Sequence, residues 1–291
     1  MAVLAAAVLA GVILGGLEGL IGKWFSLFLL FPALVGGAAG WAASGMVQRY
    51  KVRAPALVLL LGFLGGAAGY ATDHAVRYVR FRSEIAQAMK RDGPAASDSE
   101  IAAKIDEELI SEVGAPGVRG FLALSARAGV RIKHAGSSDD TAGPTFTGTA
   151  AWIVWAIELL IAAGIAAGLA WSRARDPFCE ACETWYGPAS IVATGGPGDK
   201  ATKNQLTAAL ETGDVDAAAR SFFTPRDARA RAVFQLTAAT CPRCDGDAYC
   251  QLDRVMTKKR AQQSKLATWL MSRAELQELT GALGRAQPRV R

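Results

Sequence analysis

The sequence predicts a mainly α-helical protein: a bundle of four transmembrane helices joined to a small α+β, zinc-ribbon-like C-terminal domain. Two observations lead to this fold class. Of the 291 residues, 51% are hydrophobic, and charge is spread unevenly: residues 1–72 hold four Lys or Arg and one acidic residue, whereas residues 172–291 hold 18 and 13. The polar C-terminal part also contains two Cys-x-x-Cys motifs. A mean hydropathy of +0.20 excludes a disordered chain.

Four stretches are long and apolar enough to cross a bilayer, which takes about 20 residues because about 30 Å of hydrocarbon is crossed at 1.5 Å per residue. They are residues 2–21, 24–47, 54–72 and 150–171. Hydrocarbon offers the backbone no hydrogen-bond partners, so each stretch is expected to be helical. No basic residue precedes the first stretch and a second follows at once, so an uncleaved helix is favoured over a signal peptide.

Glycines recur every four residues in these stretches, and small residues on one stripe let helices approach closely in lipid. This pattern favours tight packing within one chain first, and association of several copies second. The rows are Gly11, Gly15 and Gly19; Gly36 and Gly40; Gly62 and Gly66; Gly65 and Gly69; and Gly164 and Gly168.

Two carboxylates, Glu18 and Glu158, lie inside predicted spans, where a charge is costly and often functional. Asp73 and His74 directly follow the third span. Successive spans cross the membrane in alternating directions. The end of the first span, the end of the third and the start of the fourth therefore lie on the same side of the membrane, so these four residues could form a proton or cation site. The alternative is that Glu18 reaches the lipid headgroups and Glu158 hydrogen-bonds within the bundle. That alternative is favoured, because no second charge accompanies either glutamate inside its span.

Residues 73–149, between the third and fourth spans, are predicted to form an amphipathic helical domain. The third span continues as a helix to about residue 91, Ser97 opens a second helix, and a third covers about residues 118–132. Their apolar faces could pack together or lie on the membrane surface, and packing is the simpler interpretation. Residues 134–149 are rich in Gly, Ser and Thr and are predicted to be a loop.

Residues 172–291 are predicted to form the zinc-ribbon-like domain with a helical insertion. A capping box of Ser272 and Glu275 opens its last helix. The other expected elements, in order, are a Gly/Pro-rich loop over 187–200, helices over Asn204–Leu210 and Val215–Phe223, strands over Ala232–Ala239 and Tyr249–Met256, and a basic turn over Thr257–Lys265.

The strongest chemical signal is the pair of cysteine motifs, Cys179 with Cys182 and Cys241 with Cys244. Two residues between thiolates let both sulfurs bind one metal at about 2.3 Å, and two such motifs complete a tetrahedral site suited to Zn²⁺. The two motifs are separated by about 60 residues, whereas the motifs of a compact zinc ribbon are separated by roughly 15–20. The longer separation requires an insertion between them. Disulfides and a redox motif remain alternatives, and Cys250 is either a structural strand residue or a substitute ligand.

The sequence predicts no enzyme. Four thiolates leave no open metal position for catalysis, and the two histidines, His74 and His134, exclude a His-Glu-x-x-His motif. The run from Gly195 to Lys200 lacks the spacing of a phosphate loop and a preceding strand, so a plain loop is expected. The basic run Lys258–Arg260, with Lys265, could contact anionic lipid or nucleic acid, but it is more often a solvated turn.

The orientation follows from charge and from the cysteines. The basic loop 48–53 favours the cytoplasm, although Arg77, Arg80 and Arg82 after the third span nearly balance it. Reduced thiols able to bind metal belong in a reducing compartment. The sequence therefore predicts that both termini are cytoplasmic.

Four stretches together resemble a group of bacterial multi-pass membrane proteins with a cysteine-knuckle tail: Phe31–Gly36, Gly120–Val130, Trp155–Gly164 and Pro177–Cys182. The resemblance spans most of the chain, implies the bacterial inner membrane, and carries no activity with it. The expected function is non-catalytic docking or scaffolding, with the bilayer, a protein at the tail and further copies of the chain as partners. A small transporter using Glu18 and Glu158 is the first alternative. A membrane-tethered nucleic-acid binder is the second.

Overall fold

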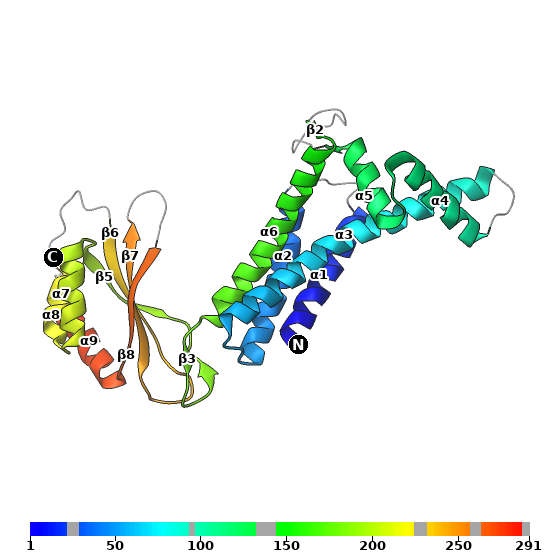
Figure 1. Cartoon of the computed structure of the whole chain (residues 1–291). Coiled ribbons are helices and arrows are strands. Elements are labelled where there is room, and N and C mark those ends of the chain that lie inside the picture. Colours follow the sequence, from blue (N-terminus) through cyan, green and yellow to red (C-terminus); the bar gives the residue numbers. More distant parts are fainter. Residues whose placement is uncertain (22–28, 93–96, 132–143, 224–231, 257–262, 287–291) are drawn as a thin grey trace. The chain divides into compact units, whose positions relative to one another are not determined.

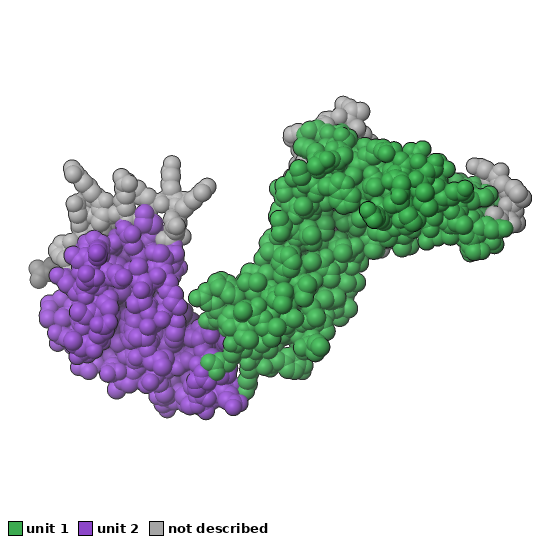
Figure 2. Space-filling model, viewed as in Figure 1, with its two compact units in different colours: residues 1–175 green, residues 176–291 purple. Residues whose placement is uncertain are grey.

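The computed structural model describes residues 1–21, 29–92, 97–131, 144–223, 232–256 and 263–286 (Figure 1). The chain divides into two compact units, Met1–Arg175 and Asp176–Arg291 (Figure 2). The first unit is almost entirely helical, and the second combines a small sheet with three helices.

The first unit is built on four helices, α1 (Ala2–Ile21), α2 (Leu30–Arg49), α3 (Pro55–Asp92) and α6 (Thr149–Ala174). Within the described residues, α2, α3 and α6 are long and apolar enough to span a membrane. The described part of α1 gives a shorter apolar helix, Ala2–Leu17. The first residues of the predicted 24–47 span lie outside the described part of the chain.

Glycine determines how closely these helices pack. A Cβ atom on Gly15 would lie 2.0 Å from the carbonyl oxygen of Gly69 in α3, and one on Gly36 would lie 2.3 Å from that of Ala162 in α6. Both contacts are too close for any side chain, so glycine is required there. By contrast, a Cβ on Gly164 or Gly168 would meet nothing within 4 Å. The predicted rows therefore serve packing within the chain, except for the row on α6, which faces away from the described helices.

Helix α3 continues well past its apolar part and carries a small helical arm. Ser97 caps α4 (Asp98–Val113) through a capping box with Glu100. The apolar stripe of α4 packs against α3, and α5 (Gly117–Ala128) completes the arm. Helix α5 ends earlier than predicted, because Gly129 adopts a positive φ of 92° and the chain turns into β1 (Val130–Arg131), which pairs with β2 (Thr145–Phe146).

The second unit is a four-stranded antiparallel sheet in the order β5-β6-β7-β8, with three helices packed on one of its faces (Figure 1). A two-stranded hairpin, β3 (Phe178–Cys179) and β4 (Thr184–Trp185), precedes the sheet. The remaining elements are β5 (Ser190–Pro197), α7 (Lys200–Glu211), α8 (Val215–Phe222), β6 (Ala232–Ala239), β7 (Ala248–Met256), β8 (Gln263–Met271) and α9 (Arg273–Ala286).

Two expectations for this unit are wrong. The predicted loop over 187–200 contains strand β5, and its glycines allow close packing: a Cβ on Gly195 would lie 2.4 Å from the carbonyl oxygen of Phe222 at the end of α8. The predicted basic turn also ends too late, because β8 begins at Gln263; residues 257–262 lie outside the described chain. The helical insertion is α7 with α8, between β5 and β6.

Candidate metal centre

The two cysteine motifs lie in the turn of the β3–β4 hairpin and in the loop between β6 and β7. The hairpin pairs Phe178 with Trp185 and Cys179 with Thr184. The rings of Phe178 and Trp185 meet edge to face, with centroids 5.1 Å apart. Glu183 takes the left-handed conformation, with φ of 46°, that the tight turn requires. The short hairpin thus presents its two thiols from one turn.

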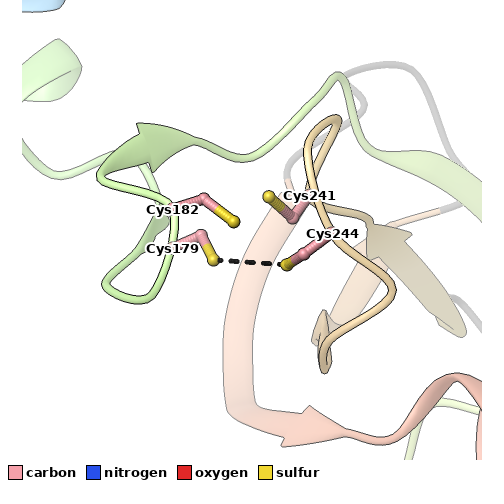
Figure 3. A group of neighbouring side chains, drawn as sticks. All are labelled: Cys179, Cys182, Cys241 and Cys244. Carbon is pink, nitrogen blue, oxygen red and sulfur yellow. Dashed lines mark hydrogen bonds between the residues drawn. The ribbon is translucent and has the colours of Figure 1, made fainter.

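The four cysteines Cys179, Cys182, Cys241 and Cys244 point toward a common centre (Figure 3). Their sulfur atoms all lie within 4.8 Å of one another, and the Cys179 and Cys244 sulfurs are 3.8 Å apart. A tetrahedron with metal–sulfur arms of about 2.3 Å has edges of about 3.8 Å. None of the five cysteines is in a disulfide. The cluster therefore has the spacing of a four-thiolate metal site rather than of two disulfides.

Backbone N–H groups of the second motif favour the thiolate form of Cys241. The amide of Arg243 donates to the Cys241 sulfur at 3.4 Å. Although burial acts to raise the pKa of Cys241, the amides of Arg243 and Cys244 and the thiols of Cys244 and Cys179 lower it to about 7. Contact with Cys244 and burial raise the pKa of Cys182 to about 12. Metals bind the thiolate, so a metal bound in this cluster would displace the remaining thiol protons.

Two hydrogen bonds connect the hairpin to the loop that carries the second motif. The Tyr186 hydroxyl donates to the carbonyl oxygen of Asp247 at 2.9 Å, and the Gly187 amide donates to that of Thr240 at 2.9 Å. These bonds hold the two motifs face to face.

Arg273 is a site residue that sequence reasoning missed. Its Nη2 donates to the carbonyl oxygens of Cys241 and Cys244, at 3.1 and 3.0 Å, and its Nη1 pairs with a carboxylate oxygen of Asp245 at 2.9 Å. The guanidinium therefore ties the second motif to the start of α9. Zn²⁺ with four thiolates carries a charge of −2, which a neighbouring cation stabilises. The capping box at Ser272 places Arg273 in the first turn of α9, but no sequence pattern connects it with cysteines about 30 residues earlier.

Cys250 does not belong to the cluster. Its side chain is fully buried on β7, in the core between the sheet and the helices. Burial raises the pKa of the Cys250 thiol to about 11, which keeps it protonated. Of the two roles considered for this residue, the structure assigns the structural one.

Three of the predicted polar residues, Asp73, His74 and Glu158, lie near one another where α3 meets α6. The Tyr70 hydroxyl donates to a carboxylate oxygen of Glu158 in α6 at 2.8 Å, and the Tyr70 ring lies against His74, with centroids 4.9 Å apart. Asp73 is 2% exposed and accepts a hydrogen bond from Nε of Arg77 at 2.9 Å. Tyr70, one turn before His74, is a partner that the sequence analysis did not consider.

Glu18 lies in α1, one turn beyond Gly15. Gly15 packs beside the backbone of Gly69 and Asp73, so this end of α1 runs along the Asp73 side of α3. The side chain of Glu18 is outside the described part of the structure.

Two weaker motifs gain no support. The Gly195–Lys200 run begins inside a strand, β5, contrary to expectation, but Asp199 caps α7 by accepting a hydrogen bond from the Thr202 amide at 2.8 Å. A carboxylate therefore occupies the place where a phosphate would bind. His134 and the basic run Lys258–Arg260 lie outside the described residues.

Comparisons with protein-family models, curated proteins and solved structures find no match for this chain. The fold and the site by themselves define the class: a chain with helices apolar enough to span a membrane and a four-cysteine cluster that could hold a metal ion.

Proposed function

We propose that this chain is a multi-pass protein of the bacterial inner membrane whose cytoplasmic C-terminal unit binds structural Zn²⁺ and serves as a docking or scaffold module. The observation that carries the proposal is the convergence of four free thiols, from two separate loops, at distances that fit one tetrahedral metal. Zinc is the metal that four thiolates at this spacing favour, and a reduced site of this kind fits the cytoplasm.

A docking role follows from the closed coordination of the metal. With four protein sulfurs bound, Zn²⁺ has no open position for water or substrate, so the site stabilises a fold rather than catalysing a reaction. The metal would join the β3–β4 hairpin to the β6–β7 loop. The result is a rigid module that follows α6 in the chain and is suited to protein contact.

The test is the metal content of the full-length chain, purified in detergent without chelator. We expect one zinc per chain in the wild type and none in Cys241→Ser. Cys250→Ala is the matched control and should retain the metal, because Cys250 lies outside the cluster. Wild-type protein without zinc, with its thiols oxidised in the cell, would contradict both the metal assignment and the cytoplasmic orientation.

The Tyr70–Glu158 hydrogen bond favours a second candidate function, proton or cation movement through the bundle. It joins a carboxylate of one candidate spanning helix to a hydroxyl of another. Flux of protons or K⁺ into liposomes containing the full chain tests this role. Glu158→Gln should abolish such flux and Tyr70→Phe should reduce it, whereas absence of flux in the wild type would end the hypothesis.

A further inference from the structure

Strand β8 forms one edge of the four-stranded sheet. Among the described strands it pairs only with β7, so the backbone groups on its other side have no strand partner. Its second half, Ala267–Met271, is regular and uncharged and contains neither proline nor glycine. The opposite edge, β5, instead has two register irregularities and ends at Pro197, features that block pairing. Of the two edge strands of this sheet, only β8 therefore lacks features that would prevent another strand from pairing with it.

A groove of about 460 Å³ runs between this half of β8 and helix α7. In the sheet, Ala267 pairs with Leu252 and Trp269 pairs with Cys250. Leu252 and Cys250 belong to the core under the helices, so Ala267 and Trp269 face the same side and form the floor of the groove. Leu210 of α7 contributes to the opposite wall. A groove between an edge strand and a helix is the arrangement that binds an extended peptide by strand addition.

The groove has a negative rim. Its lining includes the carboxylates of Glu211 and Glu275 and contains no Lys, Arg or His. The Glu275 carboxylate also accepts the Ser272 amide in the capping box of α9, while Glu211, at the exposed end of α7, adds a second charge. This charge is complementary to basic side chains on a bound peptide.

Two polar atoms beside the groove lack hydrogen-bond partners among the described residues: Nε1 of Trp269 and Oγ1 of Thr207. Both atoms are buried, so the Trp269 indole would have to rotate slightly before its N–H could reach a ligand. An unpaired buried donor destabilises the free protein, and a carbonyl oxygen of a bound peptide would remove that cost.

We propose that this groove binds an extended peptide segment of a partner protein, which adds to β8 as a fifth strand and carries apolar and basic residues two positions apart. The partner's backbone would pair with Ala267–Met271. Every second side chain of the added strand would face the helices; an apolar one would lie over Trp269, and a basic one two positions along would face Glu211. The inference rests on the proposed docking function and specifies the chemistry of the docked partner.

The test measures binding of a fluorescein-labelled Thr-Val-Thr-Lys-Thr-Val-Thr peptide, whose Val and Lys side chains share one face of a strand, to the full-length chain in detergent, by fluorescence anisotropy. Glu211→Lys should weaken binding by about 3- to 10-fold, because it replaces an attractive charge with a repulsive one. Glu278→Lys makes the same charge change at an exposed site of α9 outside the groove and should leave binding unchanged. The matched Thr-Val-Thr-Glu-Thr-Val-Thr peptide should bind more weakly.

Hydrogen exchange and a further variant test the mode of binding. The lysine-containing peptide should slow amide exchange in β8. Trp269→Phe should leave the stability of the free protein unchanged or raise it, since an unpaired N–H is removed, yet weaken peptide binding by about 3- to 10-fold. A purely structural tryptophan would show the opposite effect on stability.

Zinc is measured in every sample, so failure of the metal site is distinguishable from failure of the groove. Zinc-loaded protein that binds neither peptide would overturn the inference while leaving the metal site intact. Equal weakening by Glu211→Lys and Glu278→Lys would do the same, as would cross-links showing β8 of one copy paired with β8 of another.

Discussion

Removing one metal-binding cysteine should release the β3–β4 hairpin and leave the sheet folded. Besides the four sulfurs, the connections of the hairpin to the rest of the unit include the hydrogen bonds of Tyr186 and Gly187 to the β6–β7 loop and the contact of the Tyr186 ring with that of Tyr249 on β7. By contrast, the sheet and its helices share a separate apolar core that includes Phe234, Leu252 and Leu279. Cys241→Ser is therefore expected to act locally.

The magnitudes support a local effect. Ordering the eight backbone residues Phe178–Trp185 costs about 8–16 kcal/mol, at about 1–2 kcal/mol each. The two connecting hydrogen bonds return about 1–3 kcal/mol in total. Zinc binding in small modules contributes roughly 10–16 kcal/mol of apparent free energy, enough to offset the cost. Without the metal, the hairpin should detach.

Hydrogen exchange followed by mass spectrometry on the full-length chain provides the assay. In Cys241→Ser, amides of residues 178–185 should lose protection, while those of β6 and β7 away from the site keep theirs. Limited proteolysis should produce a new cut between β3 and β4. Cys250→Ala should show neither change. Unaltered protection of residues 178–185 in zinc-free Cys241→Ser would refute the reasoning, because the hairpin would then be held by protein contacts alone.

Three further outcomes are expected. Gly36→Ala should destabilise the helical bundle by about 1–3 kcal/mol, because its Cβ would lie 2.3 Å from a carbonyl oxygen of α6. Thermal unfolding in detergent measures this, and Gly164→Ala, whose Cβ meets nothing within 4 Å, is the control that should not lower the stability. Arg273→Ala should lower zinc affinity by about 10–100-fold in chelator competition, and equal affinity would remove this residue from the site. Alkaline phosphatase fused after Arg175 should be inactive in a bacterial host and a fusion at Gly114 active, and the reverse pattern would invert the proposed topology.

Local patterns in the sequence are sufficient to predict many of the helices and strands. The apolar runs predicted helices because only a helix satisfies the backbone in hydrocarbon. The strand over Ala232–Ala239 and the last helix, opened by Ser272 and Glu275, are confirmed. The four cysteines of the two motifs do lie close enough together to hold one metal ion, since the spacing within each motif is a local property that fixes how two sulfurs can converge.

Tertiary structure decided the features that depend on residues far apart in the chain. Strand β5 is rich in glycine and was predicted to be a loop; it is a strand because α8 packs against Gly195 so closely that no Cβ fits. Arg273 reaches the second cysteine motif only because the sheet returns the chain to the same end before α9 begins. The groove beside β8 likewise depends on where α7 crosses the sheet. Sequence spacing reports on neighbours within a turn or a strand pair, whereas these contacts join segments whose separation along the chain says nothing about their distance in space.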